Sequence, residues 1–213
     1  MIMSQLPYSY IAIEGNIGAG KTTLTHLLAQ ELAAATVLEE FAENPFLAPF
    51  YDNPTRYALP LELSFLEERF RQQKAAIHGN KRLISDYIWE KSYVFASVNL
   101  KGHEWQLFQR FYGHLAGQLR SPDLVIYLHR STSRLQQQIG LRGRSYEQHI
   151  PSEYLDKVSA GYHQFFKEEQ RMPVLWIEEN DEKPASAEVL SKYILSIIPD
   201  QRPPGLHPIV AHF

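Results

Sequence analysis

The sequence predicts an α/β protein built around a parallel sheet. Short apolar runs rich in β-forming residues alternate with longer segments of helical periodicity, and a glycine-rich loop joins the first run to the first helical segment. The 213 residues, of which 44% are hydrophobic, suffice for one core of single-domain size. This alternation is typical of a sheet covered by helices on both faces, with ligands bound at the carboxyl ends of its strands.

Five runs are expected to form the strands, namely residues 8–13, 36–38, 82–85, 124–128 and 174–177. Two long amphipathic helices are expected between them, each with an apolar stripe that we expect to face the core. The first stripe comprises Leu59, Leu63, Leu66, Phe70 and Ile77, and the second, between Trp105 and Arg120, comprises Phe108, Phe111, Leu115 and Leu119. A helix of a partner chain is an alternative cover for part of one stripe.

We expect a single domain over residues 1–199. The tail, residues 200–213, contains Pro203-Pro204-Gly205 and is interpreted as an irregular extension.

The composition favours a protein that acts on small molecules. A net charge of -3 and a pI near 6.3 provide no basic field for nucleic acid. The absence of cysteine excludes disulfides and thiolate metal sites. The N-terminus lacks a targeting pattern, and no apolar run has the length of a membrane span, so we expect a cytoplasmic protein with neither a membrane nor a nucleic-acid partner.

The octapeptide GNIGAGKT has the pattern of a phosphate-binding loop. Its glycines let backbone N–H groups converge on a polyphosphate at a helix N-terminus, its lysine supplies a positive charge, and its threonine hydroxyl can bind Mg²⁺. A glycine turn with an incidental lysine is the alternative, which the flanking strand and helix disfavour. We therefore expect ATP or GTP to bind at Gly15, Asn16, Ile17, Gly18, Ala19, Gly20, Lys21, Thr22 and Thr23.

Three acidic residues follow the second and third expected strands. Asp86 can hold Mg²⁺ together with Thr22, or can serve as a helix N-cap. Glu39 and Glu40 lie at the same sheet edge as the loop, and either can accept a proton from a substrate hydroxyl. Without the phosphate loop, this pair would be interpreted as a solvated turn.

Arg142-Gly143-Arg144 ends a helical stretch and is followed by Glu147. A glycine-hinged loop with two guanidinium groups is suited to close over a triphosphate and to neutralise charge in the transition state. Cationic capping of the helix C-terminus is the alternative. We favour an arginine lid because the phosphate loop is present elsewhere in the chain.

Several longer segments resemble the deoxyribonucleoside kinase family, especially its bacterial deoxyguanosine and deoxyadenosine kinase branch. They are IAIEGNIGAGKTT (11–23), ENPFLAPFYDNP (43–54), SDY (85–87), YVFAS (93–97) and LRGRSYEQHIPSEYL (141–155). The resemblance implies a P-loop kinase fold with a five-stranded parallel sheet and an arginine lid. It also implies Mg²⁺-ATP as donor, a deoxynucleoside phosphorylated at its 5′-hydroxyl, and a homodimer paired through helices.

The resemblance also implies roles for single residues. The family's general base matches Glu39, and its lid arginines match Arg142 and Arg144. The family's ligands of the sugar 3′-hydroxyl match Tyr51 and Glu147. Its ligands of the base match Glu62, Arg69 and Phe95.

Three positions depart from the usual family pattern. Glu40 replaces a proline after the catalytic glutamate, which leaves open which of the two acids acts. Tyr87 stands in place of an arginine, and Gln138 stands where the lid often has another. Charge stabilisation would then rest on Lys21, the two lid arginines and Mg²⁺.

Glu62 stands where the family usually has a glutamine that reads the base. An ionised carboxylate only accepts hydrogen bonds, which suits the two adjacent donors of guanine better than the donor and acceptor of adenine or cytosine. We therefore expect a purine deoxynucleoside kinase that prefers deoxyguanosine. Alternatively, Glu62 pairs with Arg69 on the same helix face and does not touch the base.

Other functions remain as alternatives: a deoxyadenosine or broad-specificity deoxynucleoside kinase, a nucleoside monophosphate kinase, or a nucleotide-dependent switch. The switch is opposed by the absence of an Asn-Lys-x-Asp pattern, since Arg82-Leu83 follows Asn80-Lys81.

Overall fold

The structure is a computed structural model, which describes residues 6–40, 44–76, 82–179 and 184–211. Its strands are β1 (Tyr10–Gly15), β2 (Ala35–Val37), β3 (Leu83–Ser85), β4 (Leu124–His129), β5 (Pro173–Glu179) and β6 (Gly205–Ala211). Its helices are α1 (Lys21–Glu31), α2 (Leu47–Asp52), α3 (Pro54–Ala76), α4 (Lys91–Asn99), α5 (Gly102–Ala116), α6 (Thr132–Arg142), the short 3₁₀ helix η1 (Ser145–Glu147), α7 (Ser152–Glu168) and α8 (Ala187–Ile197). Each of the five expected strands is present.

The strands form one parallel sheet in the order β2-β3-β1-β4-β5-β6. β1 lies between β3 and β4, so the chain first builds one half of the sheet and then crosses β1 to build the other. This is the topological switch point of an open α/β sheet, where ligands bind beyond the carboxyl ends of the strands. The loop that follows β1 occupies this position.

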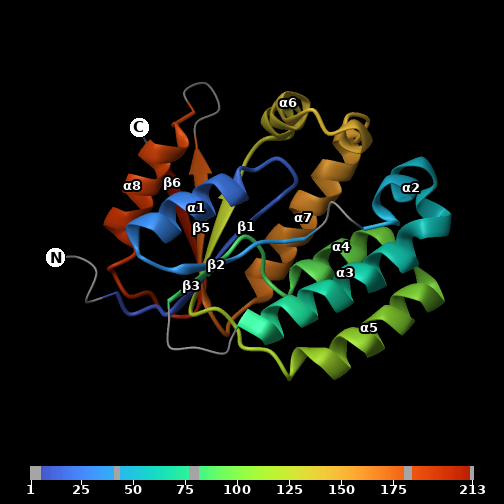
Figure 1. Cartoon of the computed structure of the whole chain (residues 1–213), viewed down its shortest axis with the longest axis horizontal. Coiled ribbons are helices and arrows are strands. Elements are labelled where there is room, and N and C mark those ends of the chain that lie inside the picture. Colours follow the sequence, from blue (N-terminus) through green and yellow to red (C-terminus); the bar gives the residue numbers. More distant parts are fainter. Residues whose placement is uncertain (1–5, 41–43, 77–81, 180–183, 212–213) are drawn as a thin grey trace.

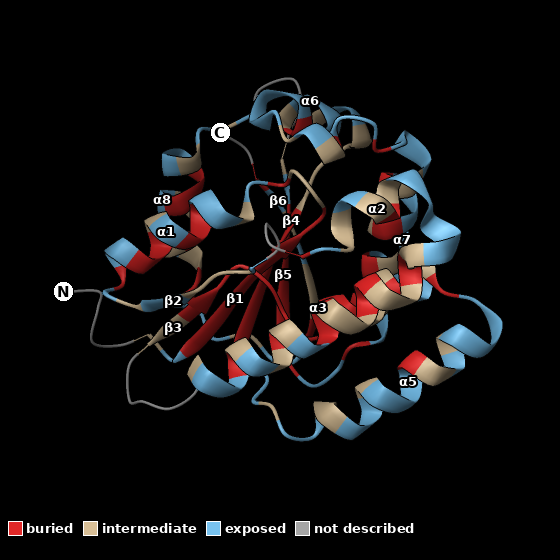
Figure 2. Cartoon of the chain, turned by 45° about the vertical axis from the view of Figure 1, so that its right-hand side comes forward, coloured by how far each residue is buried: buried red, intermediate tan, exposed pale blue. Residues whose placement is uncertain are grey.

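Helices cover both faces of the sheet (Figure 1). On one face, α1 and α8 pack on alternate strand residues such as Ile11 and Ile126. On the other face, α4 and α7 pack on the intervening residues, among them Tyr10 and Tyr127. Since both faces are covered, the central strands are apolar for most of their length, with Glu14 and His129 near their carboxyl ends, and Figure 2 shows these strands as largely buried.

A third apolar cluster joins α2, α3, α4 and α5 outside the α4–α7 layer. The expected stripe of α5 is correct in part. Phe108 is fully buried, but Phe111 is 49% exposed, whereas Tyr112 turns inward and stacks on Trp89 with a centroid separation of 5.2 Å. The reason is helical phase, because positions 105, 108, 112, 115 and 119 share one face and position 111 does not. In the first stripe, Ile77 lies outside the described residues.

The expectation of an irregular tail is wrong, and so is the expectation of five strands. Residues 205–211 form β6, which pairs in parallel with the whole of β5 and makes the sheet six-stranded. Pro208 lies within this strand, and the outermost strand of a sheet tolerates proline because only one of its edges is paired. Among the described residues, no helix combines the length and the apolarity needed to cross a membrane.

Candidate active site

The loop between β1 and α1 has the backbone shape of a phosphate cradle. Gly18 has a φ of 83°, and a Cβ atom there would lie 2.9 Å from the carbonyl oxygen of Leu135, so only glycine fits. Lys21 begins α1, and its Nζ donates to the carbonyl oxygens of Gly15 and Asn16, at 3.0 Å each. Burial, followed by the positive charge of Lys91, lowers the pKa of Lys21 to about 8. A nearby anion would restore its charged form.

Asn16 plays a different part in the loop. Its Nδ2 donates to the carbonyl oxygen of Leu155 and to Ser159 Oγ, both at 2.8 Å, and its Oδ1 accepts from the N–H of Ile17. This side chain fastens the loop to α7. Gly15 and Asn16 belong to the expected nucleotide-binding set, but neither residue lines the two cavities at this end of the sheet.

Asp86 connects the ends of three elements. It follows β3, accepts from Thr22 Oγ1 at 2.6 Å, and accepts from the N–H of Glu39 at 2.7 Å. The oxygens of Thr22 and Asp86 therefore lie together beside the loop, and hard oxygen donors of this kind suit Mg²⁺ when substrate phosphates supply further ligands. The expected pair of metal ligands thus fits the ion.

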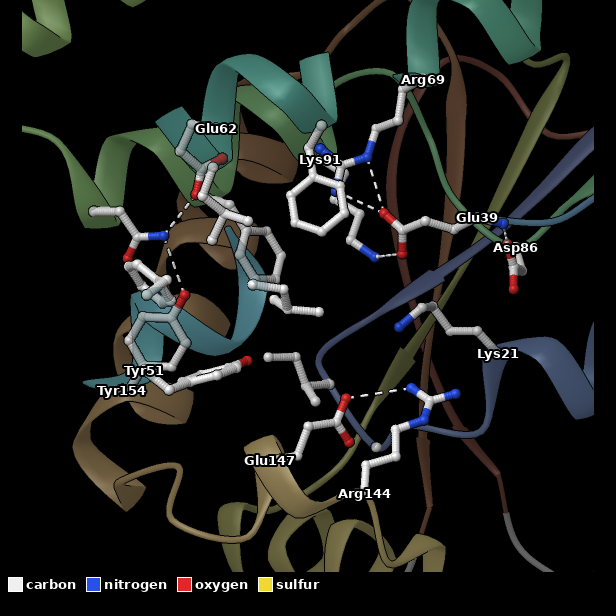
Figure 3. Close-up of a pocket in the computed structure, with 18 of the residues that line it drawn as sticks. Lys21, Glu39, Tyr51, Glu62, Arg69, Asp86, Lys91, Arg144, Glu147 and Tyr154 are labelled. Atoms are coloured by element: carbon white, nitrogen blue, oxygen red, sulfur yellow. Dashed lines mark hydrogen bonds and ion pairs between the residues drawn. The ribbon is translucent and has the colours of Figure 1, made fainter. Parts of the chain in front are cut away.

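A cavity lies beside the loop, bounded by α2, α3, α4 and the segment after α6 (Figure 3). It brings together expected residues from distant parts of the sequence, namely Ile17, Gly18, Lys21, Thr22, Glu39, Tyr51, Glu62, Arg69, Asp86, Phe95, Arg142, Arg144 and Glu147. An adjoining cavity runs over the outer side of the loop and is lined by Ala19, Gly20 and Thr23, together with both lid arginines. The two cavities share Lys21, Glu39 and Asp86 at their junction.

Glu39 lines both cavities at this junction. Its Oε1 accepts from Arg69 Nη2 at 2.6 Å and Nε at 2.9 Å, and its Oε2 accepts from Lys91 Nζ at 2.6 Å. Burial acts to raise the pKa of Glu39, but the charges of Lys91 and Arg69 outweigh it and hold that pKa well below its usual range. The side chain of Glu40 is 70% exposed and lies 3.5 Å from Arg71, away from the cavity. Of the two neighbouring acids, only Glu39 lines it.

Glu62 lies deeper in the cavity wall, on α3. Its Oε1 accepts from Asn99 Nδ2 at 2.7 Å, and the same amide nitrogen donates to the hydroxyl of Tyr154 at 3.1 Å. Burial raises the pKa of Glu62 to about 7, although the hydrogen bond from Asn99 and the charge of Arg69 oppose this. Arg69 donates hydrogen bonds to Glu39 and Ser92, so its partners differ from the alternative in which Arg69 pairs directly with Glu62.

The lid forms where α6 ends. Gly143 has a φ of 69°, which turns the chain so that Arg142 and Arg144 both reach Glu147. Arg142 Nη2 bonds Glu147 Oε2, and Arg144 Nη1 lies 3.2 Å from Oε1. Burial, followed by the negative charge of Glu147, raises the pKa of Tyr51 far above its usual range. Tyr51 and Glu147 line the same cavity, and their expected role as ligands of the sugar stays a prediction.

Sequence reasoning missed three polar residues that line this cavity, namely Lys91, Asn99 and Tyr154. The first two stand four residues before and after Phe95 on α4, so they share its helix face. That spacing was the available signal, because Phe95 was already expected in the site. Tyr154 carries no comparable sequence signal.

The fold and the site together are those of a nucleotide-binding P-loop kinase. The family described as Deoxynucleoside kinase matches residues 11–198, which is most of the chain, and the protein belongs to this family. It is therefore an enzyme, a transferase that phosphorylates deoxynucleosides.

Relatives with assigned activities have similar sequences over most of the chain. The deoxyguanosine kinase of Bacillus subtilis is 35% identical over 76% of this chain and 80% of its own length. The deoxyadenosine kinase of Dictyostelium discoideum is 32% identical over 87% and 79%. The deoxyadenosine/deoxycytidine kinase of Bacillus subtilis is 31% identical over 91% and 95%.

Solved structures agree with this assignment. The deoxyadenosine kinase from M. mycoides with the products dCMP and dCDP superposes with a TM-score of 0.78 at 26% identity, covering 88% of this chain and 97% of that one. The same enzyme with bound dATP gives a TM-score of 0.69 at 28% identity, covering 75% and 84%.

Proposed function

We propose that the protein transfers the γ-phosphoryl group of ATP to the 5′-hydroxyl of a purine deoxynucleoside and prefers deoxyguanosine. The observation that carries the proposal is a buried glutamate, Glu62, in the wall of the cavity that also contains Glu39 and the phosphate loop. As a carboxylate, Glu62 matches the two adjacent N–H donors of guanine. Mismatched buried polar groups discriminate strongly between substrates.

The site residues divide the work by position. Glu39 lies at the junction of the two cavities, where it would accept the hydrogen bond of the 5′-hydroxyl. Tyr51 and Glu147 would hold the 3′-hydroxyl, and Phe95 would pack on the base. Arg69 supports Glu39 rather than the base, because its guanidinium is committed to that carboxylate.

ATP would supply the phosphoryl group, and Thr22 and Asp86 would hold Mg²⁺, which would neutralise part of the phosphate charge. The 5′-oxygen forms a bond to the γ-phosphorus, the bond from this phosphorus to the β,γ-bridging oxygen breaks, and ADP leaves. Glu39 takes the proton of the 5′-hydroxyl. Because two cations make Glu39 a weak base, it orients the hydroxyl early and receives the proton late, as a loose transition state requires.

A deoxyadenosine kinase is the second candidate, and one observation favours it. The pKa of Glu62, raised to about 7, leaves much of the side chain protonated near neutral pH. A neutral carboxyl group both donates and accepts, as the amide of glutamine does, and so matches adenine. The balance between the two purines therefore depends on the protonation of a single group.

The test is an ATP-coupled assay of the four deoxynucleosides and their 5′-monophosphates, side by side, at several pH values. We expect the purine deoxynucleosides to have the highest kcat/KM, with deoxyguanosine ahead at alkaline pH. A clear preference for deoxycytidine or thymidine would reject the purine assignment. Faster turnover of the monophosphates would show a nucleotide kinase instead.

Glu62→Gln tests the same point from the protein side. This change should move the preference towards deoxyadenosine, whereas Glu67→Gln, an exposed glutamate on the same helix, should leave it unchanged. Equal shifts in both variants would remove Glu62 from base recognition.

A further inference from the structure

Lys91 is a buried lysine at the first turn of α4, in the wall of the cavity shared by the phosphate loop and Glu39 (Figure 3). Its Nζ lies 2.6 Å from Glu39 Oε2, and the ring of Phe95 lies beneath the ammonium at 5.6 Å. Burying an ammonium is costly unless it is paired, so this position requires a function or a partner. Glu39 is one partner, but it is already held by Arg69.

Two ammonium groups face the same space. Figure 3 shows the side chains of Lys21 and Lys91 extending towards each other beside Glu39. Both side chains line the cavity, one from α1 and one from α4. The nearby acids have other partners: Asp86 accepts from Thr22 and from the Glu39 backbone, and Glu14 accepts from the backbone of Gly15 and Ile88 and from Tyr162. An anion between the two lysines would relieve their repulsion.

The residue directly after Asp86 brings no positive charge to the cavity. Tyr87 is fully buried, and its hydroxyl donates to Gln72 Oε1 at 2.8 Å. Lys91 follows four residues later, at the start of α4, where it lines the first cavity and places its ammonium group against Glu39. The phosphate end of the site thus receives a cation from α4 in addition to Lys21 and the lid arginines.

We propose that Lys91 is a catalytic cation: its ammonium bridges the Glu39 carboxylate and the γ-phosphoryl group of ATP and stays with that group while it moves to the 5′-oxygen. This inference rests on the proposed function. In this arrangement one side chain orients the residue that receives the hydroxyl proton and neutralises charge at the reacting phosphorus, where a fixed cation has its largest effect on rate.

Lys91→Met removes the charge and keeps most of the side-chain length. We expect kcat to fall by about 10²- to 10³-fold, whereas Lys91→Arg should keep kcat within about tenfold of the unchanged protein. Lys167→Met, at an exposed position of α7, is the matched control and should leave kcat unchanged. Turnover of Lys91→Met within about threefold of the unchanged protein would overturn the proposal.

Equilibrium binding of ADP and of a non-hydrolysable ATP analogue gives a readout that is independent of turnover. Lys91→Met should weaken the binding of the analogue by about tenfold relative to the binding of ADP, because only the analogue presents a γ-phosphoryl group. Equal weakening of both nucleotides, or of neither, would show that Lys91 does not contact this group. Wild-type protein that binds both nucleotides but phosphorylates no deoxynucleoside would reject the proposed function and would leave the binding comparison valid.

A double variant protects the test against misfolding. Lys91→Met leaves Glu39 with one of its two cations, so Glu39→Gln and Glu39→Gln/Lys91→Met are compared as a pair. If Lys91 contacts the phosphoryl group, the double variant loses the preference for the analogue over ADP that Glu39→Gln retains. If Lys91 serves only as the partner of Glu39, the two variants bind both nucleotides alike, and the proposal fails.

Discussion

Asn99 donates a hydrogen bond from Nδ2 to Glu62 Oε1 at 2.7 Å, whereas Glu62 Oε2 is buried without a hydrogen-bond partner in the described part of the chain. An unsatisfied buried oxygen is costly, and in a cavity wall it is a ready acceptor for a ligand. The carboxyl group is thus fixed at one oxygen and available at the other. Its protonation state then decides which purine edge it matches.

The ratio of kcat/KM for deoxyguanosine over deoxyadenosine should rise with pH. Burial raises the pKa of Glu62 to about 7, so the neutral form, which suits adenine, predominates below that pH and the carboxylate, which suits guanine, predominates above it. Measuring both substrates between about pH 6 and about pH 8 tests this expectation. The ratio should be flat in Glu62→Gln and should keep its slope in Glu67→Gln. A ratio independent of pH in the unchanged protein would contradict this mechanism.

Asn99→Ala should move this transition to higher pH. The hydrogen bond from Asn99 favours the ionised form of Glu62, so its removal raises the pKa of Glu62 further. At neutral pH, the preference for deoxyguanosine should therefore fall severalfold. Ser97→Ala, an exposed position on the same helix, is the control. A transition that stays in place would mean that Asn99 does not set the charge of Glu62.

Glu39→Gln should lower kcat by about 10²- to 10⁴-fold, with a smaller effect on the KM of the deoxynucleoside. The neutral side chain loses the proton acceptor at the 5′-hydroxyl and leaves Lys91 and Arg69 without their shared anion, so the melting temperature should fall as well. Glu40→Gln should change neither quantity, because its side chain is 70% exposed. Steady-state kinetics and thermal unfolding of the two variants decide between the neighbouring acids, and near-normal turnover of Glu39→Gln would move the base elsewhere.

Two glycines of the lid segment should respond oppositely to alanine. Gly143 has a φ of 69°, so Gly143→Ala should destabilise the protein by about 1 kcal/mol and should reduce kcat by misplacing Arg142 and Arg144. Gly140 lies within α6, with open space around its Cβ position, so Gly140→Ala should stabilise by about 0.5 to 1 kcal/mol. Urea unfolding measures both changes. The same sign in both variants would argue against a left-handed hinge at Gly143.

The strands of the sheet were predictable from sequence where a local apolar run is enough to indicate a strand. Residues 10–13 and 124–128 are continuous apolar runs, as a strand buried on both faces requires, and each strand is followed by a helical segment. β6 was missed because Pro203, Pro204 and Gly205 signal irregular chain, and Pro208 interrupts the run that follows. The strand forms there because β5 offers a free edge, which is a property of the assembled sheet.

The candidate site was predictable as a set of residues, but not as a set of contacts. The phosphate loop, the lid and the acids after the strands carry their chemistry in local spacing, and the structure gathers most of them at one cavity. Arg69 was expected at the base, and in the cavity its guanidinium pairs with Glu39. Sequence cannot decide this choice, because a long side chain on α3 reaches either target and packing against α4 fixes which one it meets.

The sequence by itself determined the order of the first five strands and the position of the phosphate loop, because periodicity and glycine spacing are local properties. It also determined that a carboxyl group, and not an amide, stands at position 62. Tertiary structure alone decided that Glu39 rather than Glu40 enters the cavity, that Lys91 joins it, and that burial shifts the pKa of Glu62 towards neutrality. Burial and charge proximity arise only when segments distant in the chain are packed together.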